Sequence, residues 1–476
     1  MAILFQGYLK VKRKITASKG GTKYGERKKA VGQMINEEDE LLRKLEPILK
    51  EKTKGLWYLN LFSKDPKSER DNKAILRLLA DKKVKLDYQK SIRLPPPSKE
   101  NLGGEYHFGD VIYPDQEYAQ FGLRENEFIK HILIVGMTGT GKTNLSFQLL
   151  RELVKKKKPF LVFDWKQSYR DLRQLPEFQN LRIIRLGEDN ESFRFNPLIP
   201  PDGVKPKHWM TMLIDIIKHA FFVGHGVEYF LRKGIDQLYD SFGIYKGKKV
   251  YPTFYDLEKI MKREFVKGRE LLWMSAVKRV LACLTFSGLL GDLINTRKQD
   301  GFEKLFKENV IIEMDNLANV EKVFFIESFL LWLYEFRKLE GKREQFKHAI
   351  FLEEAHHVLS GAKEIKYGEE TVIETVIRMI REYGQSMVII DQEPGKLSRS
   401  IIANTNCKIC FNLGNGNDIW EIAKSMSLEK EEQKNIDKLK VGHAIVKMKE
   451  RFTEPVHIKI PLIKINKGSR REVQYL

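Results

Sequence analysis

Residues 131–153 read HILIVGMTGTGKTNLSFQLLREL, and this stretch decides the fold. Within it, Gly136 to Thr143 match the pattern G-x-x-x-x-G-K-[ST], whose backbone N–H groups cradle phosphate oxygens. An apolar run precedes the pattern and a helical segment follows it, which is the order of strand, loop and helix that a phosphate site needs. The stretch therefore predicts a nucleotide-binding P-loop in an α/β protein.

The residues of this loop have separate predicted tasks. Lys142 would reach the β- and γ-phosphates of a nucleotide, and the hydroxyl of Thr143 would bind Mg²⁺. The helix that begins here adds the partial positive charge of its N-terminus. We therefore expect ATP and Mg²⁺ as cofactors. The expected nucleotide-binding residues are Gly136, Thr138, Gly139, Thr140, Gly141, Lys142 and Thr143.

A second apolar run ends in two acidic residues, in IFLEEAHHVL at 350–359. A P-loop ATPase needs an acid here that holds Mg²⁺ through water, often with a glutamate beside it that polarises the attacking water. We expect Glu353 in the first role and Glu354 as the general base. Glu353 and His356 also have the spacing of a di-iron site, but such a site needs a second Glu-x-x-His and two further glutamates on helices, and the pair Glu354 and His357 overlaps the first.

From about residue 104 short apolar runs alternate with long helical patterns, which is typical of a parallel α/β sheet. A mostly helical insert, roughly 205–300, interrupts this alternation. Its aromatic residues, such as Trp209, Phe221 and Phe222, favour a subdomain core over platforms for stacked bases. We expect strands at 131–136, 159–164, 309–315, 348–353, 386–391 and 407–413.

The chain is strongly basic, with a formal net charge of +20 over 476 residues. Residues 1–100 carry 25 Lys and Arg against 13 Asp and Glu, so 12 of the 20 excess charges lie there. A basic surface of this size attracts phosphate backbones and indicates a polyanionic partner. Surfaces rich in lysine and glutamate are also typical of thermophilic proteins, so the charge alone leaves both interpretations open.

Three cysteines in a chain of this length argue against a disulfide framework and favour a reducing compartment. Cys407 and Cys410 form a C-x-x-C pair, but Cys283 is remote and a closed zinc site lacks ligands, so we interpret the pair as part of a buried strand. No stretch approaches about 18 consecutive apolar residues, and the N-terminus lacks a signal-peptide pattern. We expect an intracellular protein without membrane insertion.

EEAH at 353–356 resembles both the DEAH-type helicases and the HerA/FtsK superfamily of hexameric DNA-pumping ATPases, so other segments decide between them. Those segments resemble the HerA/FtsK superfamily, occur in the expected order and span about residues 104–466. They are HILIVGMTGTGKTNL (131–145), FLVFDWKQSY (160–169), FNPL (195–198), YPTFYDL (251–257), MVIIDQEPGKLSRSIIANTNCKI (387–409) and VGHAIVKMKERFTEPVHIKIP (441–461).

The resemblance implies a RecA-like P-loop NTPase core with a parallel-rich sheet at 104–466, carrying the helical insert. Members of the superfamily usually begin with a small β-barrel, whereas residues 1–100 here read as a basic arm followed by helices, and a basic tail at 467–476 ends the chain. Lys166 and Gln167 stand where relatives often have His or Lys followed by Gly, which leaves the role of that turn open.

The resemblance also implies roles for residues outside the phosphate loop. Gln392 takes the place of the polar residue that reads the γ-phosphate. The segment VIRMIREYG at 376–384 resembles the one that supplies arginines to a neighbouring subunit, and an apolar stripe at helical spacing leaves Arg378 and Arg381 just beside it. We favour Arg381 of the two, with an ordinary solvated helix face as the alternative. His356 would either couple nucleotide state to DNA or simply form a hydrogen bond at the end of a strand.

The function implied by the resemblance is an ATPase that forms a homohexamer and translocates on or unwinds double-stranded DNA. A nuclease is a candidate partner, and the expected location is the cytoplasm of a prokaryote, an archaeon or a mobile element of one. The alternatives are a pump for conjugation or viral genome packaging, an ATP-regulated DNA-binding scaffold with slow hydrolysis, and a protein-secretion ATPase. Stimulation of hydrolysis by DNA would separate the motors from the last two.

Overall fold

A computed structural model describes residue 92 and residues 94–188, 194–286, 289–299, 301–341, 343, 345–368 and 370–465. The basic arm and helices expected at 1–100 lie, apart from residues 92 and 94–100, outside the described residues. The basic tail expected at 467–476 lies outside them as well.

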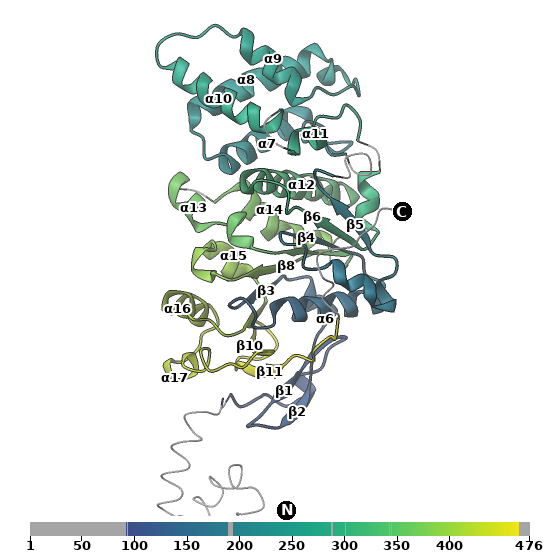
Figure 1. The fold of residues 1–476 in the computed structure, drawn as a ribbon, viewed down its shortest axis with the longest axis vertical. Coiled ribbons are helices and arrows are strands. Elements are labelled where there is room, and N and C mark those ends of the chain that lie inside the picture. Colours follow the sequence, from purple (N-terminus) through teal and green to yellow (C-terminus); the bar gives the residue numbers. More distant parts are fainter. Residues whose placement is uncertain are drawn as a thin grey trace, which may run out of the picture. The chain divides into compact units, whose positions relative to one another are not determined.

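The described chain is built on one mixed sheet of 11 strands (Figure 1). Their spatial order is β2-β1-β11-β10-β9-β3-β8-β7-β4-β6-β5. The seven strands from β9 to β5 are parallel, and the other four pair antiparallel at one edge. The strands are β1 (Tyr106–Ile112), β2 (Glu117–Leu123), β3 (Ile132–Val135), β4 (Phe160–Asp164), β5 (Arg182–Arg185), β6 (Val310–Glu313), β7 (His348–Leu352), β8 (Gln385–Asp391), β9 (Cys407–Cys410), β10 (His443–Met448) and β11 (Val456–Lys459).

The expected mostly parallel α/β fold is therefore confirmed, because the six strands predicted from apolar runs are six of the seven parallel strands. The seventh, β5, has the sequence RIIR and only two apolar residues, so it gives no run to detect. β1 and β2, with the sequences YHFGDVI and EYAQFGL, mix apolar with polar and small residues without regular alternation, and we did not predict these two strands of the antiparallel edge.

The helices lie on both faces of the sheet and in a separate layer. The α-helices are α5 (Glu125–Phe128), α6 (Lys142–Lys155), α7 (Pro206–Ala220), α8 (His225–Ser241), α9 (Phe254–Arg263), α10 (Glu270–Leu284), α11 (Leu290–Ile294), α12 (Asn319–Glu340), α13 (Gly361–Tyr367), α14 (Val372–Ile380), α15 (Arg399–Asn404), α16 (Gly416–Ser425) and α17 (Lys430–Gln433). Short 3₁₀ helices are η1 (Lys99–Asn101), η2 (Arg170–Gln174), η3 (Pro176–Phe178), η4 (Ile244–Lys246), η5 (Phe302–Phe306), η6 (Ala355–His357), η7 (Arg381–Tyr383) and η8 (Pro394–Lys396).

Two hydrophobic cores follow from the alternation of side chains along the strands. Ile132 and Ile134 of β3 pack in one core with Leu145 and Leu149 of α6. Leu133 and Val135 lie in the other core, which also contains the apolar residues of α12, α14 and the helices between β5 and β6. Consecutive residues of the P-loop strand therefore pack on opposite faces of the sheet, so that side chains hold the strand in place on both sides.

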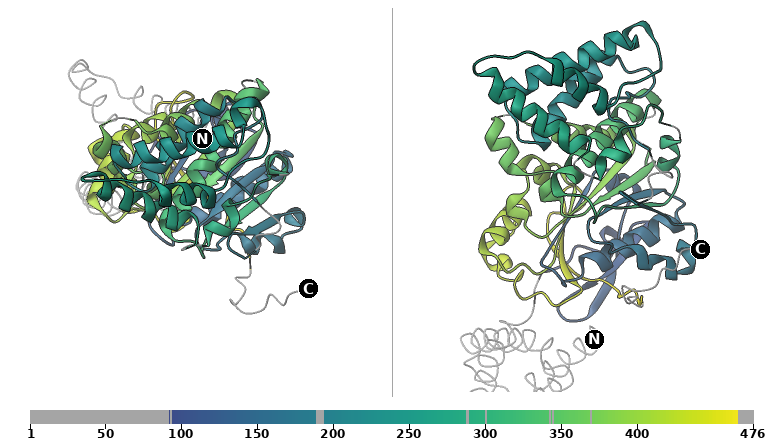
Figure 2. Two further views of the ribbon diagram at one scale, coloured as in Figure 1. Left: turned by 90° about the horizontal axis from the view of Figure 1, so that it is seen from above. Right: turned by 45° about the horizontal axis from the view of Figure 1, so that its top comes forward.

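Helix α12 is apolar nearly all round, with VFFIESFLLWLYEF at 323–336. A helix of this kind must be covered on every side. It lies between the sheet and the helices α7 to α11, as Figure 1 shows, and its buried residues belong to the core that both share. In the turned view on the right of Figure 2 the teal helices of this segment again lie at one end, above the green α12 layer.

The segment between β5 and β6 forms helices α7 to α11. Trp209 is fully buried there, and its indole N–H donates to the carbonyl of Pro197 at 2.9 Å. Phe221 is half-buried against the core, but Phe222 is 46% exposed, so its interpretation as a core residue was wrong. It follows the end of α7 in a left-handed conformation, with φ 53°, and the Lys366 ammonium lies 4.7 Å from the centre of its ring.

The C-x-x-C pair lies on β9, and both cysteines are fully buried. Residues three apart on a strand face opposite sides of a sheet. Accordingly Cys407 packs in one core and Cys410 in the other. Across the described residues, every helix is too short or too polar to span a bilayer.

Candidate nucleotide site

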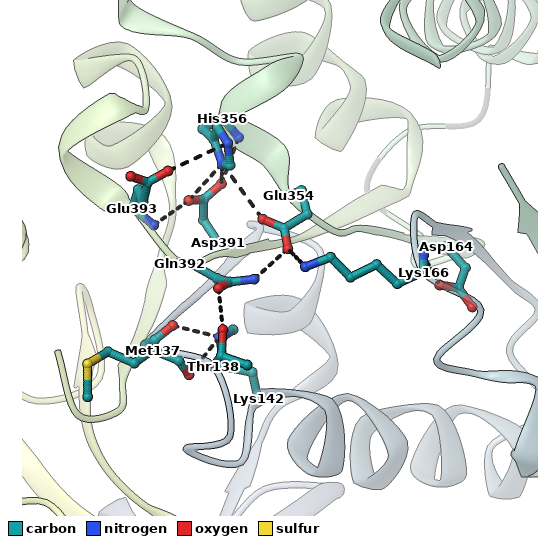
Figure 3. Close-up of polar contacts among 11 residues, drawn as sticks. Met137, Thr138, Lys142, Asp164, Lys166, Glu354, His356, Asp391, Gln392 and Glu393 are labelled. Atoms are coloured by element: carbon teal, nitrogen blue, oxygen red, sulfur yellow. Dashed lines mark hydrogen bonds and ion pairs between the residues drawn. The ribbon is translucent and has the colours of Figure 1, made fainter. Parts of the chain in front are cut away.

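The glycine-rich loop joins β3 to α6, as the sequence predicts, and holds the Lys142 side chain close to its own backbone. The Lys142 ammonium donates to the carbonyls of Gly136 at 2.6 Å and Met137 at 3.0 Å (Figure 3). Burial lowers the pKa of Lys142, while the charges of Glu354, Glu353 and Asp391 act in the opposite direction. The loop therefore presents a buried cation among acidic residues.

Two of the loop glycines are required by close packing. A Cβ at Gly136 would lie 2.6 Å from the Cβ of Phe411, and one at Gly141, where φ is 120°, would lie 3.1 Å from the ring of the same phenylalanine. Phe411 directly follows β9, the strand beside β3. The loop is thus pressed against the neighbouring strand, and any side chain at these positions would displace it.

The loop also has backbone donors that suit a phosphate. Within the described residues, the N–H groups of Gly139, Gly141, Lys142 and Thr143 have no hydrogen-bond acceptor. The last two open α6, where the helix dipole adds positive charge. Unpaired N–H groups at a helix N-terminus bind anions, so this donor set fits the phosphates of a nucleotide.

The two glutamates follow β7, two strands from the P-loop strand. Glu353 is 8% exposed, and burial, with the charges of Asp164 and Glu354, raises its pKa to about 8. Glu354 has a left-handed backbone, with φ 47° and ψ 44°, an uncommon conformation for a residue other than glycine. The turn out of β7 thus separates the two carboxylates, and their surroundings differ.

A chain of hydrogen bonds joins the loop to Glu354. Thr138 Oγ1 donates to Gln392 Oε1 at 2.6 Å, and Gln392 Nε2 donates to Glu354 Oε1 at 2.5 Å. Lys166 Nζ reaches the same Glu354 oxygen at 2.5 Å (Figure 3). Because β8 lies between β3 and β7, its end places Gln392 between the loop and the acid. The structure therefore brings together Thr138, Lys142, Glu353, Glu354 and Gln392.

The remaining loop residues lie at the same site with fewer contacts. Thr140 Oγ1 donates to the carbonyl of Met137 at 2.7 Å, which closes the loop internally. Thr143 lies in the first turn of α6, beside the Lys142 that the acids surround. Thr143 and Glu353 are the residues that would hold Mg²⁺, Glu353 through water.

Sequence reasoning missed Asp391, which ends β8 and is fully buried. Its carboxylate accepts the backbone N–H of His356 at 2.6 Å and contacts the His356 ring at 3.0 Å. Burial lowers the pKa of His356, but the hydrogen bond and charge of Asp391, with Glu354 and Glu393, raise it overall above its ordinary value. An acid at the end of an apolar run, in MVIID, was the signal for Asp391.

The structure does not bring the two arginines to the nucleotide site of their own chain. Arg378, on α14, pairs with Glu370 at 2.8 Å, and Arg381 begins η7, which precedes the start of β8. The site lies at the other end of β8, where Gln392 follows Asp391. Six steps of about 3.3 Å along that strand place the two ends roughly 20 Å apart. The prediction that an arginine reaches a neighbouring subunit therefore stays a prediction.

These features define a P-loop NTPase. The phosphate loop lies between β3 and α6, the acids follow β7, and a polar residue follows β8, all on a mostly parallel sheet. Two family models narrow this class. "Helicase HerA, central domain" matches residues 106–259, and "Helicase HerA-like C-terminal" matches residues 295–469. The chain carries both domains and belongs to the HerA-like P-loop ATPases, which confirms the resemblance seen in the sequence.

Two curated relatives are similar over much of the chain. The DNA double-strand break repair helicase HerA of Saccharolobus solfataricus is 25% identical over 365 residues, 72% of this chain and 66% of that protein. The protein of the same name from Sulfolobus acidocaldarius is 24% identical over 361 residues, with the same coverage. The match spans slightly less than two thirds of the length of these relatives.

Solved structures show where else this fold occurs. VirB4 of Thermoanaerobacter pseudethanolicus has a TM-score of 0.57 at 16% identity, covering 76% of this chain and 97% of VirB4. The bacterial plasmid coupling protein TrwB, solved in complex with ADP and Mg²⁺, has a TM-score of 0.51 at 12% identity, covering 79% and 98%. At these identities the likeness establishes a common fold.

Proposed function

We propose that this protein is an Mg²⁺- and ATP-dependent motor that assembles as a ring, a homohexamer, and translocates on or unwinds double-stranded DNA. One observation carries the enzymatic part of the proposal. The phosphate loop, with its unpaired N–H donors, is connected through Thr138 and Gln392 to the buried acid turn that bears Glu354. A loop that only bound nucleotide would not need a hydrogen-bonded connection to a carboxylate.

The chain's own residues divide the work of hydrolysis. Lys142 and the N–H groups that open α6 would neutralise and orient the phosphates, and Glu354 would orient a water for in-line attack on the γ-phosphorus. Gln392, hydrogen-bonded to both Thr138 and Glu354, would couple binding of the γ-phosphate to the position of the general base. Mg²⁺, held by Thr143 and through water by Glu353, would supply charge neutralisation on the phosphate oxygens.

The ring is supported by the position of the arginines. Arg381 is half-buried near the amino-terminal end of β8, whereas its own nucleotide site lies at the carboxyl-terminal end of that strand. Within the described residues, the Arg381 side chain has no hydrogen bond or ion pair. An arginine so placed is suited to stabilise transition-state charge in the site of a neighbour, in the manner of an arginine finger. Arg378, already paired with Glu370, is the weaker candidate.

Double-stranded DNA as the substrate is supported by the family and by the charge. The curated relatives are named as DNA repair helicases, and the net charge of +20 suits a phosphate backbone. A nuclease partner and a location in the cytoplasm of a prokaryote, archaeal or carried by a mobile element, belong to the same proposal. The experiment below separates a motor from a slow ATP-regulated scaffold, whereas a pump for conjugation or genome packaging would share the motor's dependence on DNA.

The test is steady-state ATP hydrolysis on a sample whose oligomeric mass has been measured. The rate is compared without DNA, with single strands and with duplexes of increasing length. A translocating ring predicts stimulation that grows with duplex length until it saturates. Stimulation by DNA without dependence on length would favour the scaffold, and a monomer indifferent to every DNA would contradict the proposal.

A further inference from the structure

The turn that follows β4 is tightly fixed by its own acid. The carboxylate of Asp164, the last residue of β4, is fully buried and accepts the N–H of Lys166 and the N–H of Tyr169, each at 3.0 Å. Gln167 has a left-handed backbone, with φ 56°, and its amide donates to Asp315 at 2.7 Å. The bond to Asp315 holds Gln167 in a conformation that favours glycine.

Trp165 anchors the other side of this turn. Its ring is 5% exposed and stacks on His357, with ring centres 4.8 Å apart and planes 19° apart. The ammonium of Lys322, in α12, lies 4.8 Å from the centre of the Trp165 ring. The turn therefore contacts both the segment that follows Glu354 and the long helix beneath the helical insert.

Lys166 is the residue of this turn that points to the Glu354 carboxylate, as Figure 3 shows. Its ammonium forms an ion pair with Glu354 Oε1, the oxygen that also accepts from Gln392. The other carboxylate oxygen lies 4.0 Å from the His356 ring. With one oxygen accepting from two donors and the other facing a histidine, both carboxylate oxygens of Glu354 are directed at groups of the protein.

The two partners differ in how firmly they are held. The Lys166 side chain is 59% exposed, whereas that of Glu354 is 13% exposed. A largely exposed ammonium can leave an ion pair for water at little cost, because solvent screens the charges and replaces the hydrogen bonds. The Lys166–Glu354 contact is therefore an interaction that can open while the buried framework on both sides stays in place.

We propose that Lys166 is a positioning residue that restrains Glu354 in a resting orientation, and that its withdrawal frees Glu354 for catalysis. Once released, Glu354 accepts a proton from water, the O–H bond breaks, and the oxygen attacks the γ-phosphorus as the bond to the ADP oxygen breaks. This inference rests on the proposed function, because it takes Glu354 as the general base. DNA binding would favour release of Lys166, so the restraint would keep hydrolysis slow in the absence of DNA.

The test compares Lys166→Met and Lys166→Gln with Lys166→Arg, measuring kcat and KM for ATP with and without saturating duplex DNA. We expect the two uncharged variants to raise the DNA-free kcat at least threefold with KM within twofold of the original, so that stimulation by DNA shrinks. Lys166→Arg should keep the restraint. Lys249→Met is the matched control, because Lys249 is exposed and also pairs with an aspartate, Asp202, at 3.0 Å.

The outcomes distinguish a failure of the Lys166 restraint from a failure of the proposed ATPase function. A DNA-free kcat for both uncharged variants equal to or below that of the original protein would overturn the restraint, while leaving the ATPase intact. A residue needed only for folding would change the melting temperature without raising kcat, which also counts against the restraint. If the original protein does not hydrolyse ATP at all, the proposed function fails; if Glu354→Gln hydrolyses ATP normally, Glu354 is not the general base; in either case the restraint fails as well.

Discussion

At the scale of single residues, Glu354 combines a left-handed backbone with two short hydrogen bonds to one carboxylate oxygen. Such conformations persist only where the surrounding structure enforces them, and they concentrate at functional sites. Here the buried strand β7 on one side and the His356–Asp391 contact on the other fix the turn. The side chain is therefore held where its orientation matters most, between the phosphate loop and Lys166.

Replacing Glu354 by glutamine should separate binding from chemistry. The amide keeps the shape and one acceptor oxygen, so affinity for ATP should change by less than about threefold, whereas the loss of a general base should lower kcat by roughly 10²-fold or more. Binding of a fluorescent ATP analogue and steady-state hydrolysis measure the two effects. Glu450→Gln, at an exposed pair with Lys130, is the control, and normal turnover by Glu354→Gln would remove this residue as the base.

At the scale of elements, His131 connects the P-loop strand to α14, the helix that contains Arg378 and precedes Arg381. Its Nδ1 accepts the N–H of Met387 at 3.1 Å, so the proton lies on Nε2, which donates to the carbonyl of Ile377 at 2.7 Å. One buried ring thereby joins the start of β3, the strand β8 and α14. Burial lowers the pKa of His131 to about 4, with a further decrease from Arg381.

His131→Phe should destabilise the protein and flatten its response to acid. Two buried backbone groups lose their partner, each at a cost of roughly 1–3 kcal/mol. In the original protein the folded ring stays neutral while the unfolded chain binds a proton below about pH 6.5, so this contribution is complete above that pH and is lost as the pH falls toward 4. Urea unfolding at pH 7 and pH 5 measures both, and equal pH slopes for the two proteins would contradict the prediction.

The segment of α14 and η7, which contains Arg378 and Arg381, leads to a prediction about the ring of subunits. Arg381→Ala should retain ATP binding and lose roughly 10³-fold in kcat, the lower end of the effect of an arginine finger. Mixing it with Glu354→Gln should restore part of the activity, because one subunit then offers the arginine and its neighbour the glutamate. Arg378→Ala is the matched variant. Full turnover by Arg381→Ala, or no recovery on mixing, would exclude Arg381 from a neighbour's site.

At the scale of the whole molecule, the net charge of +20 predicts how DNA binding depends on salt. If the contacts are mainly with phosphates, affinity for duplexes of unrelated sequence should be equal and should fall with salt, by about 10³-fold or more between 50 and 200 mM for six or more contacts. Fluorescence anisotropy with two unrelated duplexes measures this. A constant affinity across that range would show that the charge does not bind the backbone.

The sequence by itself determined the phosphate loop, the pair of glutamates after β7 and the apolar strands of the parallel sheet, because each is a local pattern with a physical requirement. β1 and β2 lack such a pattern because they do not alternate regularly, and β5 lacks it because it has only two apolar residues, so these strands are defined by the strands beside them. Local patterns also placed Arg378 and Arg381 beside the apolar stripe of α14, whose members Ile373, Val376, Ile377 and Ile380 are buried.

Only the tertiary structure decided which side chains meet. Lys166 and Glu354 are 188 residues apart, and Asp391 and His356 are 35 apart, yet parallel strands bring their ends to one edge of the sheet. The same geometry puts Arg381 near the amino-terminal ends of the parallel strands, away from its own nucleotide site at their carboxyl-terminal ends. Sequence patterns specify which residue ends each strand. The order of strands in the sheet specifies which side chains lie beside that residue, and this order arises from packing over the whole described chain.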